Sequence, residues 1–319
     1  MEQSVSFWRR IGAYYIDSLV LVCVAAMLGM LFRPLWLQSE AAALFAGILL
    51  TLIYFTVLNS SLSGGQTAGK CLLKVRVVDR HLQTLSLRRA FFRAIVVALP
   101  LTIMFWISVF PATTVATTYA YWVGYFTPVL CSTYLFLFNR RSRQCIHDLM
   151  AGSYVVHSDA ESVPDEPIWR GHGIALLLIG GLAVLMAKPD IKQFNTEAFQ
   201  VSQQVRQSLN QAPGVIRSAV MVVPRSSISG STSMGEVGLV KINVRVDSHD
   251  RFRQSFTREL SEQLLEQFPE LRSADELQYS LHFGFQLGGF KHRDERTFSF
   301  SPNSDAGGID LAGLFSSEP

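Results

Sequence analysis

Long apolar runs dominate the first half of the chain. Four of them approach the length of about 20 residues that a helix needs to cross the hydrocarbon core of a bilayer. A fifth run is shorter and carries no charge. The alternative for this run is a buried helix of a soluble domain, but its pair of glycines is better tolerated in lipid. The pattern predicts five membrane-spanning helices, at residues 11–32, 41–58, 91–110, 119–138 and 174–187.

The second half has the patterns of a domain that folds in water. Apolar residues recur at helical spacing in two segments, and elsewhere strands are marked by alternation or by a short apolar run. We expect helices at 194–209 and 252–268. We expect strands at 215–223, 240–247, 277–287 and 297–300. The order α-β-β-α-β-β predicts helices on one face of an antiparallel sheet, an α+β two-layer domain.

The predicted fold class is a membrane all-α helical bundle of five transmembrane helices followed by a C-terminal α+β two-layer domain. A membrane domain with four of the helices takes residues 5–157, and a linker with the fifth takes 158–188. The α+β domain takes 189–300. The tail at 301–319 is expected to be disordered, although it contains an apolar island that is a candidate docking segment.

Basic residues fall on one side of the predicted spans. Residues 1–187 hold 14 of the 28 Lys and Arg residues but only 9 of the 25 acidic residues. These basic residues precede the first span or lie around the second-to-third and fourth-to-fifth loops, whereas the alternate loops hold Arg33 alone. Because cytoplasmic loops carry the excess of Lys and Arg, we expect a cytoplasmic N-terminus and an extracytoplasmic C-terminal domain.

Composition narrows the classes of function. Apolar residues make up 49% of the chain and charged residues 17%, and the net charge of +3 is too small to indicate a nucleic-acid partner. The four cysteines all lie in the first half and lack metal-ligand spacing. The second half offers no catalytic constellation. We therefore expect no enzyme activity, no cofactor and no metal.

One carboxylate lies inside the first span. Asp17 follows Arg10 by seven residues, so the two share a helix face about 10 Å apart along the axis. An unpaired carboxylate in lipid is costly, so Asp17 needs a partner, a proton or a water-filled cavity. Buried pairs of Asp17 with Arg93, or of Asp148 with Arg10, would fix helix packing. The alternative is a proton or cation site at Asp17, with His147 as a relay or simply a helix cap.

The loop after the second span has a superficial likeness to a phosphate loop. Gly64 and Gly69 have the required spacing and Lys70 follows, but Cys71 replaces the hydroxyl residue and no strand precedes the loop. A strand at 73–79 is expected next, paired across a turn with residues 84–87.

Five motifs in order resemble the RDD family of bacterial membrane proteins, over about residues 5–157. The family is named after one arginine and two aspartates, which by motif position are Arg10, Asp17 and Asp148. Two departures are the turn at 80–83 and the residues at 145–146, where the family commonly has other residues. The motifs are Arg10 with Asp17, Gly65-Gln66-Thr67-Ala68-Gly69-Lys70, Arg76-Val77-Val78-Asp79, Ser86-Leu87-Arg88-Arg89-Ala90 with Arg93, and His147-Asp148-Leu149-Met150-Ala151-Gly152.

The resemblance implies a bacterial inner membrane and a transport-associated role, for a small ion or solute, without a settled activity. The candidate intramembrane charge network is Arg10, Asp17, Arg93, His147 and Asp148, and the loop motif contributes Gln66, Gly69, Lys70 and Arg76. A non-catalytic assembly, scaffold or sensing protein is the alternative. The expected partners are the lipid bilayer and, through residues 189–319, a second copy or an envelope protein.

Overall fold

The computed structural model describes residues 5–109, 115–140, 142–164, 169–186, 197–224, 237–302 and 309–310. The chain forms two compact units. The first comprises Met1–Pro189 with Phe285–Lys291, and the second comprises Asp190–Gly284 with His292–Pro319.

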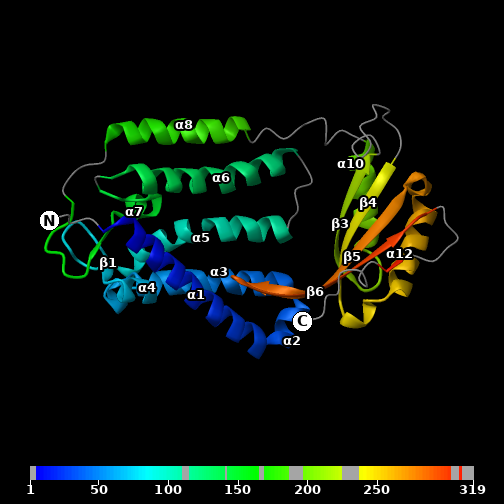
Figure 1. Cartoon of the computed structure of the whole chain (residues 1–319), viewed down its shortest axis with the longest axis horizontal. Coiled ribbons are helices and arrows are strands. Elements are labelled where there is room, and N and C mark those ends of the chain that lie inside the picture. Colours follow the sequence, from blue (N-terminus) through cyan, green and yellow to red (C-terminus); the bar gives the residue numbers. More distant parts are fainter. Residues whose placement is uncertain are drawn as a thin grey trace. The chain divides into compact units, whose positions relative to one another are not determined.

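Long helices build the first unit and run side by side in it (Figure 1). They are α1 (Phe7–Leu31), α3 (Glu40–Leu58), α5 (Leu87–Val109), α6 (Val115–Phe138) and α8 (Arg170–Met186). By length and composition, α1, α3 and residues 116–138 of α6 can cross a membrane. The helix α5 begins with several arginines and α8 has only 17 residues. The structure therefore supports a helical membrane unit with three span-capable helices among the described residues.

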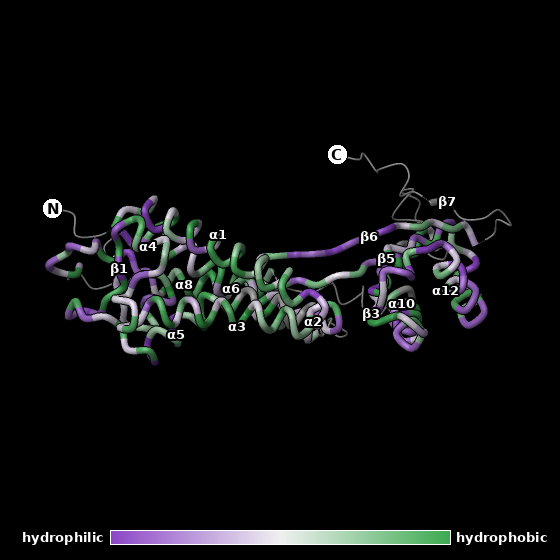
Figure 2. The backbone as a smooth tube through the Cα atoms, turned by 90° about the horizontal axis from the view of Figure 1, so that it is seen from below, coloured by the Kyte–Doolittle hydropathy of each residue, from purple (hydrophilic) through white to green (hydrophobic). Residues whose placement is uncertain are grey.

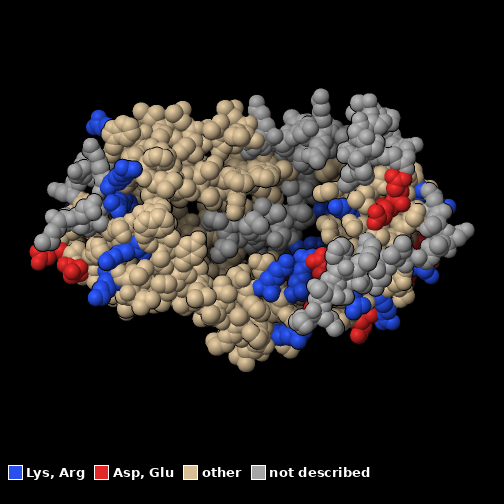
Figure 3. Space-filling view, viewed as in Figure 1, with Lys and Arg blue, Asp and Glu red and all other residues tan. Residues whose placement is uncertain are grey.

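Polarity is distributed unevenly along this unit. The tube is mostly apolar along the long helices and polar at the end that holds α4 (Ala68–Leu72) and β1 (Val75–Val78), as Figure 2 shows. On the face seen in Figure 3, several Lys and Arg side chains of this unit lie at the same end, others lie over α2 (Arg33–Gln38), and the surface over the middle of α6 and α8 carries none. This pattern is typical of helices surrounded by lipid, with their basic ends at the headgroups.

Short elements close the polar end. The strand β1 pairs antiparallel with β2 (Tyr154–His157), with Val75 opposite His157. The expected hairpin with residues 84–87 is confirmed only at its turn, where Thr84 forms an antiparallel bridge to Val78 and Asp79 N donates to the Gln83 carbonyl at 2.8 Å. The Leu85 carbonyl instead accepts a hydrogen bond from Ser61 N at 2.8 Å. The main partner of β1 is β2, which follows α7 (Ile146–Ala151) in the chain. The local patterns of two short apolar strands do not predict that pairing.

The first unit also contains seven residues from far along the chain. Phe285 and Leu287 are buried against Ala25 of α1 and Ala43 of α3. At Gly47 of α3, an added Cβ would overlap the backbone of Gly288, so only glycine permits this approach. The small residues of α1 and α3 therefore leave room for this turn to pack against both helices. The short helix α2 lies between α1 and α3 in the chain.

The second unit contains a five-stranded sheet in the order β3-β4-β5-β6-β7. Its elements are α10 (Glu197–Leu209), β3 (Val215–Pro224), β4 (Val237–Val246), α12 (Gln254–Gln267), β5 (Glu276–Leu287), β6 (Phe290–Phe300) and β7 (Ile309–Asp310). The expected order of helices and strands is observed, but the fully antiparallel sheet is wrong. The strands β4 and β5 are parallel, with Val240 opposite Leu277. The helix α12 lies between them in the chain and carries it back to the end of the sheet where β4 began.

The core of this unit lies between the sheet and its two helices. Val205 and Leu209 of α10 and Leu260 and Leu264 of α12 are almost fully buried. The buried Tyr279 hydroxyl accepts a hydrogen bond from Ser261 at 3.0 Å, so its polar end is satisfied. Beyond Pro302 the described residues are only those of β7, whose Ile309 pairs with Ser299. The rest of the predicted disordered tail lies outside the described residues.

We expect a fragment of residues 190–300 to unfold cooperatively in water, because its buried core needs no bilayer. Leu281→Ala should lower its free energy of unfolding by about 2–5 kcal/mol, the usual cost of such a cavity. Lys241→Ala, on the exposed face of β4, should change it by less than about 0.5 kcal/mol. Urea unfolding followed by circular dichroism measures both. Equal shifts for the two variants would contradict this core.

Candidate functional site

The Asp148 carboxylate is fully buried and lies between two arginines. Arg93 of α5 donates to Oδ1 from Nε at 3.0 Å and from Nη2 at 2.7 Å, and Arg10 of α1 donates to Oδ2 at 3.0 Å. The backbone N–H of Cys145 and the hydroxyl of Ser153 complete the shell at 3.2 Å each. One side chain on α7 thus joins α1, α5 and the start of β2.

Both arginines lower the pKa of this carboxyl group. Burial raises the pKa of Asp148, but the guanidinium groups of Arg93 and, less strongly, Arg10 hold it well below its usual range. The group therefore stays ionised at every physiological pH. Because Asp148 takes Arg93, the expected pair of Asp17 with Arg93 is wrong. The expected contact of Asp148 with Arg10 is present.

Asp17 is held by neutral donors instead. Its Oδ1 accepts hydrogen bonds from Gly69 N and from the Tyr54 hydroxyl, each at 2.8 Å, and its Oδ2 accepts one from the Thr67 hydroxyl at 2.6 Å. No Lys or Arg among the described residues forms an ion pair with Asp17. The carboxylate of α1 therefore caps the beginning of α4 and ties it to α3.

The glycine at position 69 permits this contact. An added Cβ there would lie 2.9 Å from the carbonyl carbon and 3.1 Å from the Cα of Ala13, in the backbone of α1. The two helices therefore approach backbone to backbone, which brings the Gly69 N–H within reach of Asp17.

Lys70 is the unusual member of the loop. Its side chain is almost completely buried, and its Nζ donates to Asn59 Oδ1 at 2.5 Å. Asn59 ends α3 and donates in turn to the Phe55 carbonyl at 2.7 Å. Burial and the positive charge of Arg93 lower the pKa of Lys70 to about 7, although Asp17 and Asp148 act in the opposite direction. Lys70 can therefore gain or lose its proton near neutral pH.

The rest of the loop motif has local structural roles. Gln66 donates to the Val75 carbonyl at 3.0 Å and to the Ser158 hydroxyl at 2.9 Å, while Arg76 reaches the Ala160 carbonyl at 3.5 Å. These contacts attach the loop to β1 and to the segment after β2. The groups that would bind a phosphate are thus used internally, and α4 has only five residues.

Residues 4–152 match the model of the RDD family. We call these residues the RDD domain, after the family whose model they match. The resemblance carried by the five motifs is confirmed over this range, and the remainder of the chain lies outside the match. No curated protein matches the chain.

His147 borders the aspartate of the RDD domain but is a poor relay. Its Nε2 lies 3.6 Å from Asp148 Oδ2. Burial and the charges of Arg93, Arg10 and Lys70 lower the pKa of His147 to about 3, although Asp148 raises it. The imidazole therefore stays neutral through the physiological range, where a relay would have to titrate.

A metal ion also fits this corner poorly. Ligand atoms of Cys145, His147 and Asp148 lie within 4.8 Å of one another. Burial, together with Asp148, raises the pKa of the Cys145 thiol to about 12, so the thiolate that would bind a metal is not formed. Two arginines already occupy the Asp148 oxygens, and their charge repels a cation.

Sequence reasoning missed several residues of the RDD domain that hold these charges. Tyr54, Asn59 and Thr67 bind the charged groups. Between α6 and α7, Asn139 donates to the Gln144 carbonyl, and the Gln144 side chain donates across α7 to the Ser153 carbonyl. A signal was available for Asn59, because an amide directly after an apolar span needs a partner. Tyr54 gave no such signal, since a tyrosine near a span end is common in any membrane protein.

We expect Arg93→Gln to destabilise the protein by about 3–5 kcal/mol, because it breaks a buried charge pair and leaves Asp148 with one cation. Arg88→Gln is the matched control on the same helix, since Arg88 is exposed. It should change stability by less than about 0.5 kcal/mol. Thermal unfolding of the full chain in mild detergent measures both. Similar midpoints for wild type and Arg93→Gln would contradict a structural role for this pair.

Proposed function

We propose that the protein takes part in transport of a small ion or solute across a bacterial inner membrane, with Lys70 as the group that exchanges a proton. One observation carries this proposal. Lys70 is a buried ammonium group whose hydrogen-bond partner is a neutral amide, 2.5 Å away. A charged lysine without a carboxylate partner is costly inside a protein. A group held in this way is a candidate for function.

The balance of charge supports the same role. Two arginines and two carboxylates lie within electrostatic reach of Lys70. The two arginines balance the two carboxylates, so the cluster is neutral only when Lys70 has lost its proton. Binding of a proton adds an unbalanced positive charge at the interface between α1, α3, α4 and α5. Such a change can favour a different arrangement of these helices.

Five spans are part of the proposal, with the N-terminus cytoplasmic and residues after 188 periplasmic. The one-sided positions of the basic residues support this topology. So do α5 and α8, which are helical although they fall outside the three span-capable helices.

A periplasmic reporter such as alkaline phosphatase, fused after Pro319, should be active, whereas the same reporter fused in the loop after Lys74 should be inactive. The physical reason is the cost of moving basic loops across the bilayer during insertion. Activity in bacterial cells measures both fusions, and a cytoplasmic reporter at the same positions is the control. An inactive fusion after Pro319 would contradict a fifth span.

We expect proteoliposomes with a trapped pH indicator to report proton movement when a Na⁺ or K⁺ gradient is applied. Lys70→Met should reduce the initial rate at least tenfold, because methionine has a similar length but cannot titrate. Lys74→Met is the matched control, since Lys74 lies on the same loop and is exposed. It should keep the wild-type rate. A wild-type rate in Lys70→Met would overturn the role of Lys70.

The dependence of stability on pH separates this role from poor folding. The pKa of Lys70 is about 7 in the folded protein and 10.5 as its ordinary value, so burial disfavours the folded state fully below pH 7. This destabilisation is relieved as the pH rises from 7 to 10.5, because there the unfolded state binds more protons. Lys70→Met should remove this rise while remaining folded.

The second candidate is a non-catalytic assembly or sensing protein that binds an envelope partner or a second copy. The specific observation in its favour is β3, one of the two outer strands of the described sheet, on which Ile216 and Met221 are exposed. An outer strand with apolar side chains can pair with another chain. Wild-type proteoliposomes without cation-dependent proton movement would favour this candidate. Neither candidate includes a catalytic step or a cofactor.

A further inference from the structure

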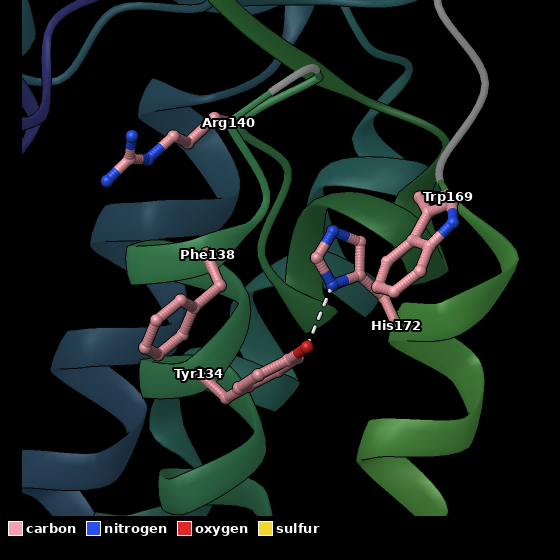
Figure 4. Close-up of a pocket in the computed structure, with 5 residues that line it drawn as sticks. All are labelled: Tyr134, Phe138, Arg140, Trp169 and His172. Atoms are coloured by element: carbon pink, nitrogen blue, oxygen red, sulfur yellow. Dashed lines mark hydrogen bonds between the residues drawn. The ribbon is translucent and has the colours of Figure 1, made fainter.

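A pocket lies between α6 and α8 in the first unit, away from the two aspartates. Its volume is about 390 Å³, and Tyr134, Phe138, Arg140, Trp169 and His172 line it (Figure 4). Tyr134 and Phe138 come from the last turns of α6, and Arg140 follows that helix. Trp169 directly precedes α8, and His172 lies in its first turn.

Ring contacts hold one wall of this pocket in place. His172 is buried, with a relative exposure of 7%, and its Nδ1 lies 3.0 Å from the Tyr134 hydroxyl. The Trp169 ring meets the His172 ring edge to face, with centroids 5.3 Å apart. Figure 4 shows Tyr134 and Trp169 on either side of His172, while Arg140 extends from the rim away from them. The site therefore has a fixed aromatic wall and a cation at its rim.

Arg140 supplies that cation. Its side chain is exposed, and within the described ranges no carboxylate forms an ion pair with it. A guanidinium presents several N–H donors in a plane, an arrangement that suits a phosphate group. Aromatic side chains with one polar end, such as Tyr134 and Trp169, prefer the headgroup level of a bilayer.

We propose that this pocket binds the phosphodiester headgroup of an anionic phospholipid. Arg140 binds the phosphate, and Trp169 and Phe138 pack against the glycerol and the upper acyl chains. Apolar surface continues from the pocket down α8, where Ile174, Leu177 and Leu178 are exposed. Acyl chains cover such a surface, whereas free phosphate would leave it without a role. The proposal requires a membrane position for α6 and α8 and is independent of Lys70.

Native mass spectrometry of the full chain in detergent tests this site with added phosphatidylglycerol and, separately, phosphatidylcholine. Wild type should bind phosphatidylglycerol at least tenfold more tightly than phosphatidylcholine. Arg140→Gln should lose about tenfold in affinity for phosphatidylglycerol, because a charge-assisted pair to the phosphate is removed. Trp169→Ala should weaken the binding of both lipids, because it removes one ring of the aromatic wall.

Arg88→Gln is the matched control, since it removes the same charge from an exposed arginine outside the pocket. It should bind phosphatidylglycerol as wild type does. Unchanged binding in Arg140→Gln, or an equal loss in Arg88→Gln, would overturn the site, the latter by showing attraction to net charge alone. Displacement of the lipid by millimolar inorganic phosphate would overturn the lipid assignment and indicate a site for a free anion.

Discussion

The contact on which the membrane unit depends is the Asp148 carboxylate between Arg10 and Arg93. These arginines lie 138 and 55 residues away along the chain, so a single buried group joins the beginnings of α1 and α5 to α7. In a medium of low dielectric, an ion pair of this kind is weak evidence for extra stability but its disruption is costly. The short elements at this end, including the pairing of β1 with β2, follow from where Asp148 holds α7.

Asp17 solves a similar problem by different means. Its carboxylate receives a backbone N–H and two hydroxyl groups, and no cation among the described residues pairs with it. Hydrogen bonds alone can stabilise a buried carboxylate when several donors converge on it. The two aspartates of the RDD domain thus have distinct partners but a common task, which is to fix a short helix, α4 or α7, against the long ones.

These two arrangements leave Lys70 as the exception. Among the cations of the cluster, Arg10 and Arg93 have a carboxylate partner, whereas Lys70 has an amide. The transport proposal depends on this difference between Lys70 and the two arginines. The assembly alternative depends on the other charged groups, whose hydrogen bonds hold the helices together. In both, the two aspartates hold helices together through the hydrogen bonds that their carboxylates accept.

Much of the architecture could be read from the sequence because helix and strand periodicity are local. The apolar runs predicted α1, α3 and α6 close to their observed bounds, and alternation at 277–287 predicted β5 within one residue of its start. The five motifs identified the RDD region, and the contact of Arg10 with Asp148 is one of the two buried pairs that the sequence suggested. Charge asymmetry also yielded a complete topology, which remains a prediction.

The tertiary structure alone decided which distant groups meet. A sequence with several cations does not say whether any of them pairs with Asp17. The expected pair of Asp17 with Arg93 is wrong because Arg93 binds Asp148, near the end of the domain. The parallel pairing of β4 with β5 and the pairing of β1 with β2 depend on where α12 and α7 return the chain. Local residue patterns predict elements, whereas partners depend on packing between segments that are far apart in sequence.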